Sequence, residues 1–137
     1  MQVREIMKSK VDVINADKTV FEAAVMMEQG RYGSIPVEKN DKMVGMITDR
    51  DIALRIVAHS RDPQSTKVSD CMSKGIVFCY ENDNLETLAE KMTASHLRRV
   101  PVVNQDKRLV GIVSLSELVK NARDPKLTQA TLESVCH

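Results

Sequence analysis

Two stretches of the chain show the same order of apolar and polar patterns, and each predicts the same succession of elements. In the first stretch, residues 11–14 are extended and residues 19–30 carry apolar side chains at helical spacing. Residues 34–38 and 42–48 are rich in β-branched side chains and flank a turn composition, which predicts two strands. A second helix is expected over residues 49–58, so the stretch predicts a β-α-β-β-α unit.

The second stretch predicts the same unit again. Extended segments are expected at residues 76–80, 99–104 and 109–114, and helices at residues 85–95 and 115–122. Short phrases recur in register between the two stretches: VREIM at 3–7 with VSDCM at 68–72, IPV at 35–37 with VPV at 100–102, and VGMIT at 44–48 with VGIVS at 110–114. The chain is therefore an internal repeat.

A single repeat of about 65 residues buries too little surface to be very stable in isolation, whereas two copies bury more when they pack together. We therefore expect an α+β fold of two β-α-β-β-α repeats, residues 1–64 and 65–123, packed as a pseudo-twofold pair. Residues 124–137 form a polar tail, which is expected either to add one more helix or to fray.

Composition narrows the class of protein. The chain has 137 residues, 42% hydrophobic and 28% charged, which is typical of a soluble globular protein. A net charge of +1 and only 3% aromatic residues argue against a dedicated nucleic-acid binder. The chain has no apolar run long enough to span a membrane, and its three cysteines lack metal-ligand spacing. We therefore expect a cytoplasmic protein with free thiols, no metal site and no membrane or nucleic-acid partner.

The most informative chemistry lies where a strand turns into a helix. Thr48 precedes Asp51 by three residues, and Ser114 precedes Glu117 by the same spacing. One interpretation is a capping box, in which each side chain satisfies a backbone amide of the first helical turn. The other is a nucleotide site, because a helix N-terminus attracts phosphate and a carboxylate accepts hydrogen bonds from ribose hydroxyls. The shorter arm of Asp51 favours the ligand interpretation at the first corner.

Two adjacent arginines form a second candidate. Arg98 and Arg99 lead into the strand that holds Pro101, and either surface charge or phosphate binding explains them. Adjacent residues of a strand point to opposite faces, so we expect at most one arginine to serve a given pocket. At the equivalent place in the first repeat, Tyr32 either stacks on a flat base or simply packs. No nucleophile, metal set or glycine-rich phosphate loop accompanies them, so we expect no enzyme.

The tandem units, the IPV and VPVV strands and the phrases VGMITDRDI at 44–52 and VGIVSLSEL at 110–118 resemble a pair of cystathionine-β-synthase (CBS) domains over about residues 1–122. The resemblance implies two clefts between the repeats for adenosine-containing ligands. In the first cleft, the resemblance assigns ligand contacts to Thr48, Arg50, Asp51, Ile76, Val77 and Phe78, with Arg98 or Arg99 near the phosphate. Pro101, in the strand that follows, is a further candidate binding residue. In the second cleft, the resemblance assigns ligand contacts to Ser114, Ser116, Glu117, Val11, Asp12, Val13, Tyr32, Ser34 and Pro36.

At position 117 the chain departs from the family pattern, because Glu117 stands where an Asp usually holds the ribose. The resemblance otherwise implies a non-catalytic sensor that requires no cofactor and binds AMP, ADP, ATP or S-adenosylmethionine as a regulatory ligand. It also implies a homodimer that signals to a partner protein. The alternative is a ligand-free dimeric scaffold that regulates a partner, in which Thr48 and Asp51 only cap a helix.

Overall fold

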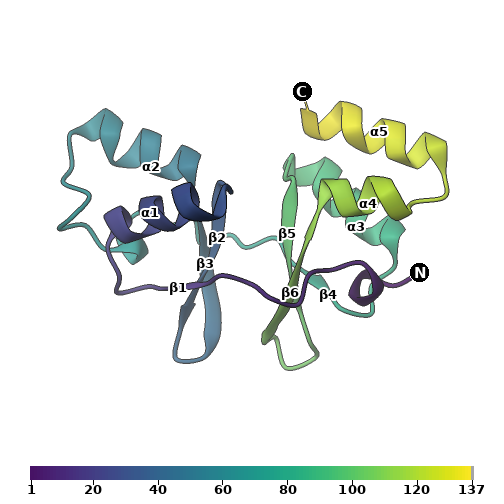
Figure 1. Ribbon diagram of the computed structural model, residues 1–137, viewed down its shortest axis with the longest axis horizontal. Helices are drawn as coiled ribbons and strands as arrows, with labels where there is room; N and C mark the ends of the chain where they lie inside the picture. Colours follow the sequence, from purple (N-terminus) through teal and green to yellow (C-terminus); the bar gives the residue numbers. More distant parts are fainter. Residues whose placement is uncertain (137) are drawn as a thin grey trace. The chain divides into compact units, whose positions relative to one another are not determined.

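The protein, seen here as a computed structural model that describes residues 1–136, divides into two compact units (Figure 1). The first-repeat unit consists of residues 12–76. The second-repeat unit combines residues 1–11 with the described residues from 77 onward. Each unit contains one three-stranded sheet with its own helices, as the α+β prediction requires.

The first-repeat unit follows the predicted order of elements. Its sheet has the order β1-β2-β3, with β1 parallel to β2 and β2 antiparallel to β3. The elements are β1 (Ile14–Asn15), α1 (Val20–Gly30), β2 (Ser34–Lys39), β3 (Lys42–Thr48), α2 (Asp49–Arg55) and two 3-10 turns, Val57–His59 and Val68–Asp70. The last predicted helix is shorter than expected, since α2 ends at Arg55 and continues only as a 3-10 turn.

Local chemistry sets the ends of α1. The Thr19 hydroxyl accepts a hydrogen bond from the Glu22 amide (3.2 Å), and the Glu22 carboxylate accepts one from the Thr19 amide (3.0 Å). The predicted capping box is therefore confirmed. At the other end Gly30 is still helical, and Arg31 takes the left-handed conformation (φ 57°) that stops the helix.

The second-repeat unit repeats this arrangement with the sheet order β4-β5-β6. Its elements are a 3-10 turn at Val3–Glu5, β4 (Cys79–Tyr80), α3 (Leu85–Ser95), β5 (Arg99–Val103), β6 (Leu109–Ser114), α4 (Leu115–Asn121) and α5 (Pro125–Cys136). The tail forms a helix, α5, that packs against α3 and α4. Of the two outcomes expected for the tail, the structure therefore contains the additional helix.

The opening segment of the chain packs in the second-repeat unit. Lys8 exchanges two backbone hydrogen bonds with Ile112 of β6 (2.8 and 2.9 Å). Gly111 permits this approach, because a Cβ there would lie 2.9 Å from the carbonyl oxygen of Lys8. Ser73 makes the equivalent pair of bonds with Met46 of β3, next to Gly45. Residues 1–11 of the first sequence repeat therefore pack in the second-repeat unit, and residues 65–76 of the second sequence repeat pack in the first-repeat unit.

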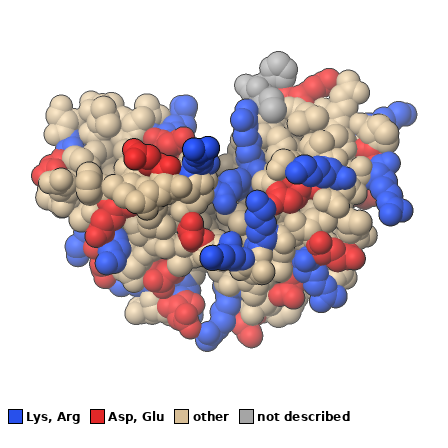
Figure 2. All heavy atoms as spheres, viewed as in Figure 1, with Lys and Arg blue, Asp and Glu red and all other residues tan. Residues whose placement is uncertain are grey.

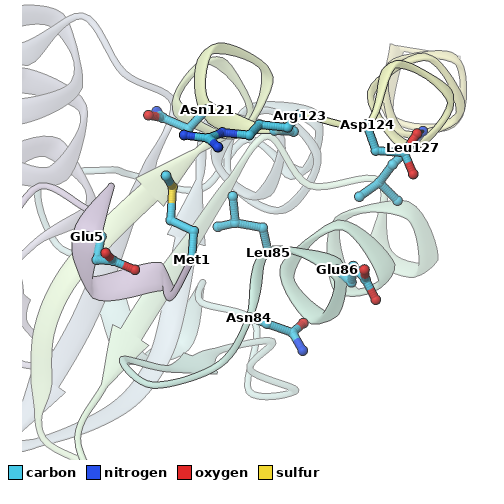
Figure 3. Close-up of a pocket in the computed structure, with 10 residues that line it drawn as sticks. Met1, Glu5, Asn84, Leu85, Glu86, Asn121, Arg123, Asp124 and Leu127 are labelled. Atoms are coloured by element: carbon cyan, nitrogen blue, oxygen red, sulfur yellow. The ribbon is translucent and has the colours of Figure 1, made fainter.

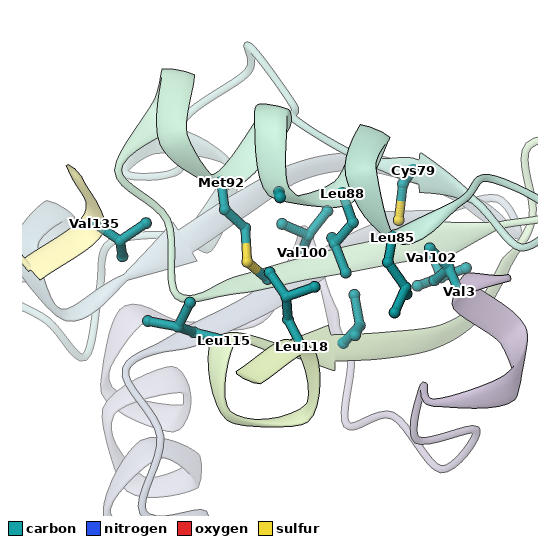
Figure 4. Packing of buried hydrophobic residues seen from close by; sticks show 12 residues of the cluster. Val3, Cys79, Leu85, Leu88, Met92, Val100, Val102, Leu115, Leu118 and Val135 are labelled. Atoms are coloured by element: carbon teal, nitrogen blue, oxygen red, sulfur yellow. The ribbon is translucent and has the colours of Figure 1, made fainter. Parts of the chain in front are cut away.

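Each unit has its own apolar core. In the second-repeat unit, side chains from α3, β5 and α4 meet between helices and sheet, and Val135 of α5 joins them (Figure 4). In the first-repeat unit the corresponding core contains Val20 and Ala23 of α1 with Ile35 and Ile47 of the sheet. Each core includes residues next to the strand-to-helix corner of its own unit, and those corners carry the candidate chemistry.

Candidate functional site

The corner between β3 and α2 is a complete capping box. The Thr48 hydroxyl accepts a hydrogen bond from the Asp51 amide, and the Asp51 carboxylate accepts one from the Thr48 amide, both at 3.0 Å. The second carboxylate oxygen of Asp51 accepts a hydrogen bond from the Ser73 hydroxyl (3.1 Å) and lies 3.9 Å from Nε of Arg55. Asp51 is only 9% exposed. Its carboxylate is therefore occupied by the protein's own donors.

The amides of this corner are occupied as well. Asp49 donates from its backbone amide to the Gly33 carbonyl (2.9 Å), and the Arg50 amide donates to the Asp49 carboxylate (2.8 Å). The Asp49 carboxylate lies so close to Gly33 that a Cβ at that position would be 2.6 Å from it. The Asp49 and Asp51 carboxylates and the occupied backbone amides leave few hydrogen-bond donors for a phosphate at this corner. A ligand role for Thr48, Arg50 and Asp51 stays a prediction.

The equivalent corner between β6 and α4 is different. The Ser114 hydroxyl accepts a hydrogen bond from the Glu117 amide (3.3 Å), but the Glu117 carboxylate does not close the box. It accepts a hydrogen bond from the Ser116 hydroxyl (3.4 Å) and lies 3.9 Å from Nζ of Lys8. The Ser114 and Ser116 hydroxyls are 2.8 Å apart. This corner therefore presents a pair of hydroxyls beside an incomplete cap.

A cavity of about 500 Å³ opens beside these hydroxyls, entirely within the second-repeat unit. We call it the α4 cavity. It is lined by Arg98, Arg99, Ser114, Leu115, Ser116, Val119, Lys120 and Leu132. Its volume lies in the range of small-molecule sites. Figure 2 shows several Lys and Arg side chains on the face of this unit near α4.

The α4 cavity is lined by cationic, hydroxyl and apolar residues. Arg98, Arg99 and Lys120 supply positive charge, and no carboxylate occurs among the described residues that line it. Guanidinium groups bind phosphate in a forked geometry, and an ammonium group acts as a point charge. Leu115 and Val119 offer an apolar wall on which a flat ring can lie. The cavity thus combines cations, hydroxyls and apolar surface.

Both arginines line this cavity, although alternation along a strand would place only one of them there. The physical reason is that β5 begins at Arg99, so Arg98 lies before the strand. Strand alternation does not apply to it. The Arg98 carbonyl instead accepts a hydrogen bond from the Leu115 amide (2.7 Å), which holds the start of β5 against the start of α4.

The α4 cavity brings together residues that the resemblance assigned to two different clefts. Arg98 and Arg99 belong to the first assignment, and Ser114 and Ser116 to the second. Sequence reasoning missed Lys120, Val119 and Leu132. Lys120 follows Ser116 by four residues on α4, a spacing that places both on one helix face and that could have identified it.

The other predicted residues lie in both units. Pro36 and Pro101 are buried in β2 and β5. The Tyr32 hydroxyl donates to the Asp12 carboxylate (2.8 Å), within the first-repeat unit, and the Tyr32 ring packs against the core. Ser34 begins β2, Ile76 is half-buried in the same unit, and Val13 is exposed.

In the second-repeat unit, Val11 and Val77 are half-buried. Phe78 makes an edge-to-face contact with Tyr80, with ring centres 5.7 Å apart. Lys91 donates to the Phe78 carbonyl (2.6 Å) and lies 5.7 Å from the centre of its ring. The expected clefts that draw on both repeats stay predictions.

Two further cavities offer less chemistry. One, of about 650 Å³, lies between the start of α3 and the start of α5 (Figure 3). Its Asn84 side chain caps α3 at the Thr87 amide (2.8 Å), and its Asp124 carboxylate accepts from the Lys126 amide (3.0 Å). The other, of about 620 Å³ in the first-repeat unit, contains Arg55, which donates to two carbonyls. The Asn84, Asp124 and Arg55 side chains therefore already serve the fold.

Neither thiol of the described core suits nucleophilic chemistry. Cys71 and Cys79 are free and buried. Burial raises the pKa of the Cys79 thiol to about 12, and burial together with the nearby Asp51 charge raises the pKa of Cys71. Across residues 1–136, no group of His, Cys, Asp and Glu side chains is arranged to hold a metal. The described helices also include none with the length and hydrophobicity to cross a membrane.

A model of the CBS domain family matches residues 3–58 and again residues 68–124. The chain belongs to the CBS domain family. The CBS domain-containing protein YhcV of Bacillus subtilis is 38% identical over 135 residues, which cover 98% of this chain and 95% of that protein.

Solved CBS structures have the same fold. The structure of the CBS domain protein TA0289 of Thermoplasma acidophilum has a TM-score of 0.85 at 26% identity, with 98% of this chain and 75% of that chain covered. The structure of CBSX2 in complex with AMP has a TM-score of 0.73 at 22% identity, with 87% and 93% covered. The α+β pair of CBS repeats expected from the sequence is therefore confirmed.

Proposed function

We propose that this CBS protein is a non-catalytic regulatory module that binds an adenine nucleotide in the α4 cavity and signals its presence to a partner protein. The observation that carries the proposal is the lining of that cavity, which combines Arg98, Arg99 and Lys120 with the Ser114 and Ser116 hydroxyls. A CBS protein of the same fold is seen with AMP, which supports the ligand class.

The charges of the cavity narrow the choice among adenosine compounds. Three cationic side chains favour the phosphates of AMP, ADP and ATP. S-adenosylmethionine has no phosphate, and its sulfonium and ammonium groups outweigh its one carboxylate, so the same side chains favour it less than a nucleotide. The proposal therefore assigns the cavity to a phosphorylated adenosine and makes S-adenosylmethionine a matched control that shares the adenosine.

The test is equilibrium binding together with thermal denaturation in the presence of AMP, ADP, ATP and S-adenosylmethionine. A ligand at a hundred times its dissociation constant stabilises the fold by about 2.7 kcal/mol. For a chain of this size the melting temperature should rise by about 5–10 °C. No binding and no shift with any nucleotide would contradict the proposal.

A pair of arginine variants tests the position of the site. Arg98→Ala removes a charged hydrogen-bond donor, so nucleotide affinity should fall by about 10- to 150-fold. Arg50→Ala is the matched control, because Arg50 is exposed at the start of α2, in the other repeat. It should leave affinity unchanged. The opposite pattern would place the nucleotide at the Thr48 corner.

A second candidate function, the ligand-free dimeric scaffold, is favoured by a different observation. In the first-repeat unit, α1, α2 and the 3-10 turn after α2 expose large apolar side chains. The equivalent positions of the second repeat hold charged residues. The pairs of equivalent residues are Phe21 and Glu86, Val25 and Glu90, Leu54 and Lys120, and Val57 and Arg123. Phe21 is 45% exposed and Val57 is 71% exposed. Such a surface is typical of an interface, and we infer that it joins two copies.

The residues of the second repeat supply the test of this interface. Phe21→Glu combined with Leu54→Lys places the second-repeat residues on the first-repeat helices, and should convert a dimer to a monomer in light scattering. Glu86→Ala, on the other unit, should leave the mass unchanged. A wild-type monomer at all concentrations, or a dimer that survives the double substitution, would contradict this interface.

A further inference from the structure

The C-terminal helix α5 forms part of the α4 cavity. Leu132 of α5 lines the cavity together with Leu115 and Val119 of α4. The tail is therefore a wall of the candidate site, although it lies outside the residues that match the family. A ligand that rests on Leu132 loses that contact whenever α5 leaves.

The contacts of α5 with the rest of the unit are limited to one stripe. Thr131 and Val135 are buried and Leu127 and Leu132 are half-buried, whereas the opposite side, with residues such as Ala130, is exposed. Two side-chain hydrogen bonds tie the helix to α3 and its end. The Ser134 hydroxyl donates to the Thr93 carbonyl (3.2 Å), and Nδ1 of His96 lies 2.8 Å from the Ser134 carbonyl.

This helix depends on docking for its existence. It spans Pro125–Cys136, and an isolated helix of that length is marginal in water. Residues 122–124 connect it to α4, and of these Arg123 and Asp124 are exposed and Ala122 is half-buried. Undocking therefore melts α5 as one local unit and uncovers the apolar side chains beneath it, including those packed around Val135.

We propose that docking of α5 is linked to occupancy of the α4 cavity, so that a phosphorylated adenosine stabilises the docked helix and its departure releases α5. The inference rests on the function proposed above. A ligand shifts a conformational equilibrium only by its different affinity for the two states, and contact with Leu132 supplies that difference. The docked or undocked tail is then the signal that a partner protein reads.

Hydrogen exchange on the unmodified protein tests the linkage. Backbone amides of α5 should exchange at least about 5-fold more slowly with saturating AMP than without it, since couplings between sites are usually of that size or larger. Binding of AMP is measured by calorimetry on the same sample. Binding with unchanged α5 exchange overturns the linkage and leaves the proposed function standing. No binding of AMP, ADP or ATP overturns both.

A variant of α5 tests the reciprocal effect. Val135→Asp places a charge in the buried stripe but not in the cavity lining, so it should undock α5. Because linkage is reciprocal, nucleotide affinity should fall by the same factor by which nucleotide slows α5 opening. Ala130→Asp adds the same charge on the exposed side of α5 and should change neither quantity. Exchange at β5 and β6 verifies that the unit stays folded. An unchanged affinity in Val135→Asp with α5 undocked refutes the linkage.

Discussion

Replacing Asp51 by Ala should destabilise the protein and leave nucleotide affinity unchanged. The substitution removes the acceptor of the Thr48 amide and of the Ser73 hydroxyl, and it leaves Arg55 without its ion pair. A helix cap contributes about 1 kcal/mol, and a hydrogen bond to a charged group about 1.5–3 kcal/mol. The Arg55 pair adds little, because it is long and half-exposed. The free energy of unfolding should therefore fall by about 2–4 kcal/mol.

The equivalent substitution in the other repeat is the control. Glu117→Ala removes no capping bond, and the Lys8 pair that it breaks is 3.9 Å long, so the loss should be about 0.5 kcal/mol or less. Urea unfolding at pH 7 measures both variants, and calorimetry with AMP measures their affinity. Equal losses of stability in the two variants would refute the capping account. Full stability with lost affinity in Asp51→Ala would show that this carboxylate binds ligand.

Two further predictions concern the packing within each unit. Gly111→Ala should cost about 1–3 kcal/mol, because its Cβ would meet the Lys8 carbonyl, whereas Gly75→Ala, with nothing within 4 Å, should be close to neutral. Urea unfolding distinguishes them, and equal effects would contradict the close approach of the opening segment. The raised pKa of Cys79, about 12 in the fold against 9.0 ordinarily, means that the unfolded thiol ionises first. The free energy of unfolding should therefore fall as the pH rises from 9 to 12. At pH 10 it should be about 1.4 kcal/mol lower than at neutral pH. A Cys79→Ala variant should lose less stability over that interval, and identical pH profiles would refute the assignment.

Local patterns predicted the elements of this fold because their causes are local. The Thr19 and Glu22 pair, the turn at residues 40–41 and the β-branched strands are signals carried by residues close together in the sequence. The short strands were harder to place, since β1 and β4 contain two residues each and exist through pairing with β2 and β5. No local pattern indicates that the opening segment packs in the second-repeat unit, because this placement depends on hydrogen bonds between Lys8 and Ile112.

The site was predictable only in part for the same reason. Residue types at the two corners indicate phosphate and ribose chemistry. They do not indicate at which corner the carboxylate completes the capping box. The short arm of Asp51, which favoured a ligand role from the sequence, lets its carboxylate reach the Thr48 amide. Glu117 makes no such bond. Leu132 joins the cavity only because α5 docks, and no spacing along the chain indicates that contact.

Amide chemical shifts of the protein titrated with AMP test the central claim most directly. If a phosphorylated adenosine occupies the α4 cavity, the shifts should change at Arg98 and Arg99, along residues 114–120 and around Leu132. Spectra that do not respond to AMP, ADP or ATP, or changes confined to the corner at Thr48 and Asp51, would contradict the account.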